Sequence, residues 1–355
     1  MNTEVPTQAV REKVGGNKAL DWIIQQFGFV GPLPVLLVGV FVYFAVTTPT
    51  FATANNLTEL AQRSVFLVLM AMGQMLVLVS GGFDLSIAAV VSFASIVSAQ
   101  VMVSLFTETG NEFLSMMLSL GFTVLIGIII GLVNGIGVAI LKINAFIVTL
   151  AVATIIGGLT IIVSGGVTVT GLPPLFARGI ASDGPLGISW MVYLTIPVVI
   201  AMYFLTNNSV FGTHLYALGD NPVAARIAGI RVERTMIIAY VLGSVLVAYG
   251  AWLLTARIGS GQPTLGGSYT METITAAVIG GASLRGGRGT IIGVVLGVLF
   301  MQMLTNGMNL ARLDTNSQQI AIGVALLFAV LIDRLRDRAR TYSAVRRRLK
   351  LVEAA

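Results

Sequence analysis

Apolar residues along this chain come in long stretches separated by short polar segments. A helix that crosses the hydrocarbon core of a bilayer needs about 20 largely apolar residues, within a range of about 17 to 25. That length predicts spans at Leu33–Val46 with its flanks, Val65–Val79, Ile87–Phe106, Leu114–Leu141, Phe146–Val163, Ile188–Leu205, Met236–Thr255, Thr270–Ile279, Ile291–Leu304 and Ile320–Ile332. The pattern therefore predicts an all-α integral membrane protein with about ten transmembrane helices, of which Thr270–Ile279 is unusually short.

The composition agrees with this class. Of 355 residues, 56% are hydrophobic and only 10% are charged, and the mean hydropathy is +0.91, whereas soluble chains carry about 25% charged residues. The chain has no cysteine and a single histidine, His214. Thiolate or histidine-based metal centres and Cys/His catalytic pairs are therefore excluded, and the residues provide little for enzyme chemistry.

The positive charges predict an orientation. If ten spans alternate from a cytoplasmic start, all but four of the 21 Lys and Arg residues fall on the cytoplasmic side. The four on the opposite side are Arg63, Arg178, Arg257 and Arg312. This asymmetry is the one that membrane proteins show, with Lys and Arg enriched in cytoplasmic loops. We therefore expect an even number of spans with both termini in the cytoplasm, although eight or twelve spans satisfy the same test.

Three parts follow from this arrangement. Residues 1–29 form a cytoplasmic N-terminal segment, 30–333 a transmembrane domain with a long cytoplasmic loop at 206–235, and 334–355 a basic cytoplasmic tail. The net charge of +6 and the basic tail indicate a topology anchor in contact with anionic lipid rather than a nucleic-acid partner.

Glycine is enriched, with 40 residues against a usual share of about 7%. Most lie within apolar segments, where glycine lets helices approach closely in lipid. Six others lie beside polar residues at the ends of short apolar runs and predict turns or broken helices: Gly81, Gly82, Gly280, Gly281, Gly286 and Gly287. The runs Val79–Leu85 and Val278–Leu284 share a V-x-G-G-x-x-L spacing, which indicates either an internal repeat or coincidence.

Two carboxylates interrupt the apolar territory. Asp84 follows the second predicted span, and Glu272 opens the eighth. An acidic residue in the membrane is costly and should reach water or find a partner. Each is interpreted first as a helix cap or first-turn acid that the helix dipole favours, and alternatively as part of a transport path.

The loop at 206–235 contains a short helix signal. Asn221 is a cap residue, Pro222 suits a first helical position, and Gly229 suits a helix end. The small residues Ala224, Ala225 and Ala228 would give this helix a face that docks closely into a groove of another protein, although the helix is equally consistent with a connector.

Several motifs resemble one known family. The block ALGDNPVAARIAGI at 217–230 is similar to the cytoplasmic coupling loop of ribose-, xylose- and galactose-type ABC sugar permeases, in which an acidic residue is frequent at the position of Val223. The likeness continues through 256–264, 276–293, 306–310 and 318–319, and GGFDLS at 81–86 resembles the family's GGIDLS signature. These motifs span residues 56–333 in the family's order.

The resemblance implies a vitamin B12-importer-like permease fold in a bacterial inner membrane. It implies a second permease subunit, two ATP-binding subunits that carry ATP and Mg²⁺, and a periplasmic binding protein that delivers a monosaccharide or related polyol. This chain has no G-x-x-x-x-G-K-[ST] motif, so no cofactor is expected on it. The residues expected to couple to the ATPase are Gly219, Asn221, Ala224, Ala225, Arg226 and Gly229, and those expected along the path are Asp84, Glu272, Asn306 and Asn309.

Two other functions stay open. An ion-coupled secondary transporter could use Asp84 or Glu272 as a proton carrier, a use that the composition alone permits. A membrane-embedded enzyme is the least favoured, because no acid/base, metal or nucleophile constellation occurs.

Overall fold

The computed structural model describes residues 33–182, 184–314, 316–325, 327–328 and 331. The predicted segments 1–29 and 334–355 lie outside these residues. The described chain is mainly helical, and an isolated antiparallel bridge joins Val169 and Gly261. Its elements are α3 (Leu33–Thr47), α4 (Ala54–Val79), α5 (Ile87–Thr109), α6 (Glu112–Ala139), α7 (Ala145–Ser164), the π-helix η2 (Leu175–Ile180), the 3₁₀ turn η3 (Pro185–Gly187), α8 (Trp190–Asn207), α9 (Val210–Asp220), α10 (Pro222–Ile227), α11 (Val232–Ile258), α12 (Tyr269–Ile279) and α13 (Ile291–Leu310).

Seven of these helices are long and apolar enough to cross a membrane: α4, α5, α6, α7, α8, α11 and α13. Helix α3 is apolar but has 15 residues, and α12 has 11. The tenth predicted span, at 320–332, lies only partly within the described residues. The chain is therefore a multi-pass membrane protein with seven candidate spans among the residues described, and the count of ten remains a prediction.

Helix α4 corrects one predicted boundary, since it begins at Ala54 rather than near Val65. Thr53 caps it by accepting a hydrogen bond from the Asn56 backbone N–H. Its first turns carry polar side chains, among them Glu59 and Arg63, which hydropathy excludes from a span although they are good helix formers.

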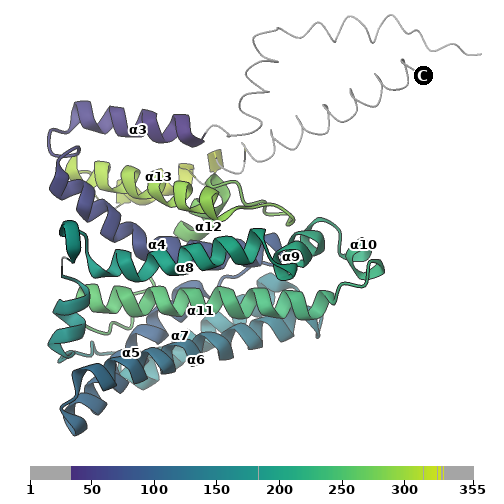
Figure 1. Ribbon diagram of the computed structural model, residues 1–355, viewed down its shortest axis with the longest axis horizontal. Helices are drawn as coiled ribbons and strands as arrows, with labels where there is room; N and C mark the ends of the chain where they lie inside the picture. The colour runs from purple at the N-terminus through teal and green to yellow at the C-terminus, as the bar shows by residue number, and fades with distance from the viewer. Residues whose placement is uncertain (1–32, 183, 315, 326, 329–330, 332–355) are drawn as a thin grey trace, which may run out of the picture.

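Helix α11 occupies the centre of the bundle, where it packs against α4, α5 and α6 (Figure 1). In the most apolar part of each helix, 89% of the residues are buried in α4 and 67% in α11, whereas only 17% are buried in α7, at the outside of the bundle. Close approach to α11 depends on glycine, because a Cβ on Gly131 of α6 would lie 2.5 Å from Val241 Cα. The outer helices leave their apolar side chains free to face lipid.

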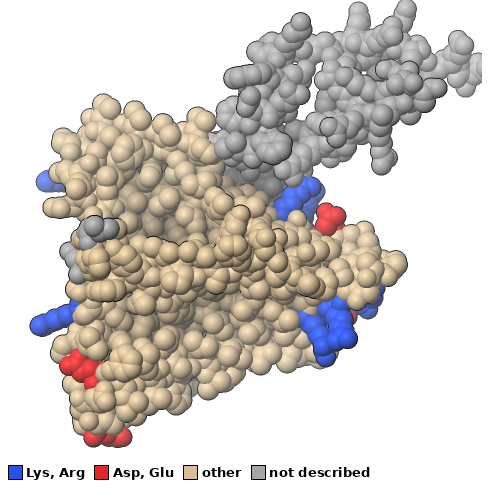
Figure 2. Space-filling view, viewed as in Figure 1, with Lys and Arg blue, Asp and Glu red and all other residues tan. Residues whose placement is uncertain are grey.

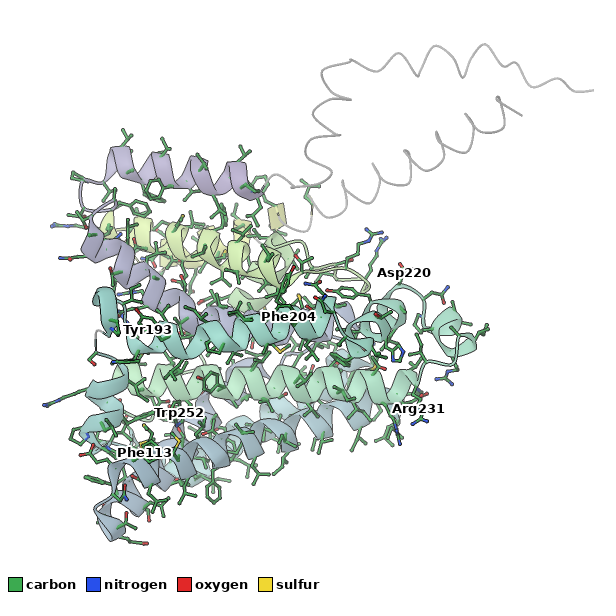
Figure 3. The ribbon with its side chains drawn as sticks, viewed as in Figure 1. Phe113, Tyr193, Phe204, Asp220, Arg231 and Trp252 are labelled. Carbon is green, nitrogen blue, oxygen red and sulfur yellow. The ribbon has the colours of Figure 1, made fainter. Side chains whose placement is uncertain are left out.

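The bundle has two charged ends. Figure 2 shows blue side chains around the end that carries α10 and a second charged set at the other end, with an uncharged surface between them on the visible face. In Figure 3, Asp220 and Arg231 mark the α10 end, and Phe113 and Tyr193 lie toward the opposite end. An uncharged belt between charged ends is the surface expected of a protein that spans a bilayer.

Candidate functional site

Helix α10 is the short helix predicted from the motif at 217–230. Asn221 ends α9 and caps α10, and its side-chain oxygen accepts hydrogen bonds from the backbone N–H groups of Val223 at 3.1 Å and Ala224 at 3.0 Å. Pro222 is the first helical residue, and Gly229 has a φ of +83° just after the helix ends. The predicted roles of Asn221 as the cap, Pro222 as the first helical residue and Gly229 as the residue that ends the helix are therefore confirmed. The helix projects from the end of the bundle (Figure 1).

The surface that α10 presents keeps only part of the predicted small-residue face, since Ala224 and Ala228 are exposed and Ala225 is not. Ala225 is only 4% exposed and belongs to a small core with Leu218 and Val232. The large exposed apolar side chains of the helix are Val223, 69% exposed, and Ile227, 83% exposed. These two residues lie four apart, on one face of the helix. Ala225 therefore anchors α10 to its own chain, which corrects the predicted face, and we call Val223 and Ile227 the α10 apolar pair.

Basic residues surround this pair. Glu233 at the start of α11 forms ion pairs with Arg226 and, at 3.3 Å, with Lys142. Arg231 and Arg234 are exposed nearby. Surface ion pairs contribute little stability, so the main effect of these residues is an excess of positive charge beside an exposed apolar pair. That combination is typical of a surface that binds a protein with acidic groups.

Gly219 is half-buried at the last turn of α9, where it packs against two other segments, and does not lie on the exposed surface of α10. A Cβ at this position would overlap the carbonyl oxygen of Val79 and the backbone nitrogen of Gly287. The predicted coupling residues therefore separate into exposed ones (Asn221, Ala224, Arg226 and Gly229) and inward ones (Gly219 and Ala225).

The predicted glycine turns form two matching helix ends. After α4, the Gly81 N–H donates to Leu78 O and the Gly82 N–H to Val77 O, with a φ of +80° at Gly81. This is the Schellman arrangement, in which a left-handed residue ends the helix.

After α12, the Gly281 N–H donates to Val278 O and the Ala282 N–H to Ala277 O, with a φ of +93° at Gly281. Gly81 therefore corresponds to Gly281, and the V-x-G-G-x-x-L alignment, which paired it with Gly280, is shifted by one residue. Gly280 instead allows α12 to approach Gly293 of α13.

Asp84 is buried in the segment between α4 and α5. It accepts hydrogen bonds from the Ser86 backbone N–H at 2.7 Å and from the Ser86 hydroxyl at 2.6 Å. Asn134 of α6 in turn donates to the Ser86 hydroxyl at 2.9 Å. Ser86 is the cap residue of α5, so Asp84 supports the helix start from two residues upstream and is not the cap itself.

The two asparagines predicted along the path, Asn306 and Asn309, lie far from Asp84. Asn306 of α13 exchanges two hydrogen bonds of 2.9 Å with Asn56, in the first turn of α4, whereas Asp84 follows the last turn of α4. Asn309 accepts a hydrogen bond from Gln318, and Glu272 accepts one from Ser268. The structure does not bring Asp84 together with the two asparagines, and their role along a path remains a prediction.

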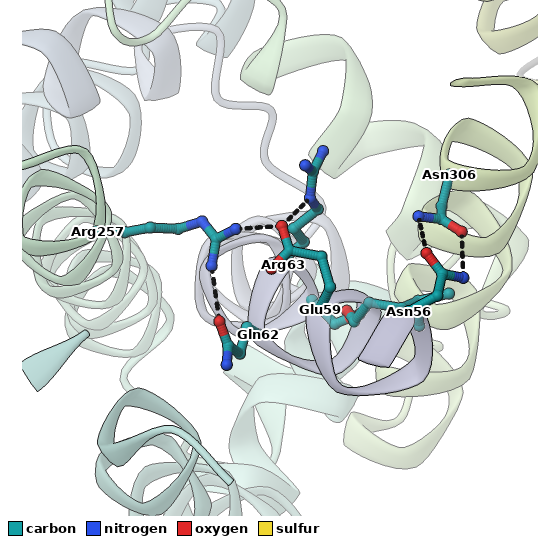
Figure 4. Close-up of polar contacts among 8 residues, drawn as sticks. Asn56, Glu59, Gln62, Arg63, Arg257 and Asn306 are labelled. Atoms are coloured by element: carbon teal, nitrogen blue, oxygen red, sulfur yellow. Dashed lines mark hydrogen bonds and ion pairs between the residues drawn. The ribbon is translucent and has the colours of Figure 1, made fainter. Parts of the chain in front are cut away.

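A polar network near Asn56 was not found from the sequence. Glu59 pairs with both Arg63 and Arg257, and Arg257 also donates to Gln62 at 3.0 Å (Figure 4). The network joins α4 to the end of α11 at the end of the bundle opposite α10. No group of three or more metal-ligating side chains occurs among the residues that the structure describes.

The two predicted sets of basic residues lie at opposite ends. Lys142, Arg226, Arg231, Arg234, Arg285 and Arg288 belong to the α10 end, and Arg63, Arg178, Arg257 and Arg312 to the other. The grouping that the positive-inside rule requires is therefore present in the described chain.

Comparison with known proteins identifies relatives along nearly the whole chain. Residues 56–332 match the model of a family described as the permease component of a branched-chain amino acid transport system. The ribose import permease protein RbsC of Escherichia coli (strain K12) is 32% identical over 317 residues, which cover 88% of this chain and 94% of the relative.

Two further relatives transport other sugars. The L-arabinose transport system permease protein AraH of the same strain is 37% identical over 328 residues, 90% of this chain and 93% of the relative. The galactose/methyl galactoside import permease protein MglC is 31% identical over 318 residues, which cover 86% of this chain and 94% of the relative. No solved structure matches. This chain, a transport subunit rather than an enzyme, belongs to the ABC transporter permease family that includes the ribose, arabinose and galactose permeases.

Proposed function

We propose that this chain is the membrane-spanning subunit of an ATP-driven importer that moves a monosaccharide or related polyol into the bacterial cytoplasm across the inner membrane. The observation that carries the proposal is the α10 apolar pair, exposed at a basic end of the bundle in a chain whose relatives are sugar permeases. The positive-inside rule favours the cytoplasm for that end.

The substrate class rests on the relatives. Their names specify a pentose in two cases and a hexose in the third. Delivery of the sugar by a periplasmic binding protein fits the opposite end of the bundle, where the connections between α3 and α4 and between α5 and α6 lie. We also infer a second permease subunit beside this one, which would complete the path, from the kinship with the sugar permeases.

Energy would come from partner subunits. Since the chain has no phosphate-binding loop motif, ATP and Mg²⁺ would bind to two ATP-binding subunits and not to this chain. The α10 apolar pair is the contact through which those subunits would act. Two exposed apolar side chains on a solvent-facing helix are costly in water and suit a groove on a protein partner.

Substitution of Ile227 tests this contact. Ile227→Glu places a charge where the partner's groove would exclude water, so we expect affinity for the ATP-binding subunit to fall by about tenfold or more, as for a central interface residue. Ile227→Leu keeps the apolar surface and is the matched control. The measurement is co-purification of the ATP-binding subunit in detergent, and equal recovery with both variants would contradict the assignment.

A further inference from the structure

Three backbone segments meet where α9 ends. They are the last turn of α9 (216–220), the turn after α4 (79–82) and the connection between α12 and α13 (286–289). The Gly287 N–H donates a hydrogen bond to Val79 O at 2.9 Å, and Gly219 packs directly against both of these groups. We call this meeting point the glycine junction.

The glycine junction is made of backbone and leaves almost no free space. A Cβ on Gly286 would lie 2.7 Å from Gly219 O and 3.1 Å from Gly81 Cα, and one on Gly287 would lie 2.9 Å from Asp220 Cα. Real Cβ atoms do not approach other atoms this closely, so each position excludes a side chain. Because no rotatable side chain separates the three segments, a displacement of one must move the others.

A side-chain hydrogen bond also joins α9 to the α12–α13 connection. The Tyr216 hydroxyl donates to Gly289 O at 2.8 Å. Burial raises the pKa of this hydroxyl, which keeps its proton available for the bond.

Helix α10 is rigidly linked to the junction. Asn221 is both the residue that ends α9 and the cap of α10, so no linker separates Gly219 from the α10 apolar pair. Ala225 of α10 is buried against Leu218, the residue before Gly219. A force on Val223 or Ile227 therefore reaches Gly219 through one short, packed stretch of chain.

The two segments that receive this force belong to related connections but occupy different positions in them, since 79–82 contains the helix end at Gly81 whereas 286–289 lies five residues beyond the corresponding helix end at Gly281. Both connections begin with a Schellman helix end, at Gly81 and at Gly281, and both lead into a helix whose cap position holds a hydroxyl residue, although the Thr290 hydroxyl accepts from the Gly293 N–H and the Ser86 hydroxyl makes no such bond. The helices that follow begin I-A-A-V-V and I-I-G-V-V. The first and fourth residues of both are buried, namely Ile87, Val90, Ile291 and Val294.

We propose that Gly219 is a positioning residue that passes a displacement of α10 to the turn after α4 and to the α12–α13 connection at once, so that the starts of α5 and α13 move together. This inference deepens the proposed function, because it depends on α10 binding an ATP-binding subunit. The physical basis is a continuous packed network with no compliant side chain at its centre.

The junction can be tested first without any partner. Gly219→Ala forces a methyl group into the backbone of the other two segments, so we expect amide hydrogen exchange to accelerate about tenfold or more in both 80–86 and 281–290 of the purified full chain. Gly121→Ala is the control, because a Cβ there meets nothing within 4 Å. Acceleration in only one segment, or in neither, would overturn the proposal.

The second test uses the complex with the ATP-binding subunit in proteoliposomes, with uptake of labelled ribose, arabinose and galactose. Gly219→Ala should still co-purify with that subunit and hydrolyse ATP, while uptake per ATP hydrolysed falls about tenfold or more. Tyr216→Phe, which removes the hydroxyl and with it the bonds to Gly289 and Thr206 but leaves the backbone contacts of Gly219 in place, should lower the same ratio less. Tyr203→Phe, on the half-exposed face of α8, should leave it unchanged.

These readouts separate the two proposals. Loss of subunit binding with Ile227→Glu tests the α10 contact, whereas Gly219→Ala keeps that contact and breaks the transmission. If no ATP-binding subunit binds α10, the proposed function fails. The hydrogen-exchange measurement on the purified chain does not need that subunit, so it still shows whether Gly219 couples the two segments. Wild-type coupling in Gly219→Ala would show that Gly219 does not transmit the displacement.

Discussion

Two glycines on α6 face different surroundings. Gly131 packs against the backbone of α11, where a Cβ would lie 2.5 Å from Val241 Cα, whereas a Cβ on Gly121 meets nothing within 4 Å. The sequence does not distinguish their roles, since both are glycines in the same apolar helix. Only the position of α11 shows that one of them sets a helix–helix distance.

Alanine substitution should therefore have opposite effects at the two positions. Gly131→Ala should lower the free energy of unfolding by about 1 to 3 kcal/mol, because the backbone of α11 has to move away. Gly121→Ala should raise it by up to about 1 kcal/mol, because alanine is the better helix former. Thermal unfolding in detergent measures both, and equal shifts would mean that α6 and α11 do not pack as described.

At the scale of elements, local signals were sufficient to predict α10. Its cap, proline and terminal glycine lie within nine residues of one another, so neighbouring residues determine the helix. The start of α4 could not be predicted in this way. Its polar first turns are stabilised by Asn306 and Arg257, which are distant in sequence, and no single-chain pattern identifies such partners.

The reciprocal pair of Asn56 and Asn306 gives a prediction about how α4 and α13 are joined. Because each amide satisfies the other, removing either leaves a partly buried polar group without that partner. In a double-mutant cycle of Asn56→Ala and Asn306→Ala, we expect a coupling energy of about 1 to 2 kcal/mol.

The cycle has a control within the same chain. Asn208 is exposed after α8, far from Asn56, so Asn56→Ala and Asn208→Ala should be additive. The measurement is again unfolding in detergent. Additive effects for Asn56 and Asn306 would show that the two amides do not interact.

At the scale of the whole molecule, the charge pattern predicted which basic residues share an end, and the described chain groups them in that way. The glycine junction could not be predicted, since it depends on where three distant turns meet. The face of α10 was predicted only in part, because Ala224 and Ala228 are exposed while Ala225 packs on Leu218 and Val232. Side-chain size alone does not show which way a short helix faces.

The absence of cysteine from the sequence allows a direct test of orientation. Val223 and Phe113 are exposed at opposite ends of the bundle, 69% and 62% respectively. In intact cells, a thiol reagent that cannot cross the inner membrane should label Phe113→Cys and leave Val223→Cys unlabelled until the membrane is permeabilised. Labelling of Val223→Cys in intact cells would show that the orientation is the opposite one, with α10 on the outer side of the membrane.

The energy source is the central claim, and one measurement tests it most directly. Uptake of labelled ribose, arabinose or galactose should be followed in cells that carry this chain and its partner subunits, with either ATP depletion or a proton uncoupler. An ATP-driven importer predicts that uptake stops when ATP is depleted and continues when the proton gradient alone is removed. Uptake that collapses with the uncoupler and ignores ATP depletion would contradict the account and favour a proton-coupled transporter that uses Asp84 or Glu272.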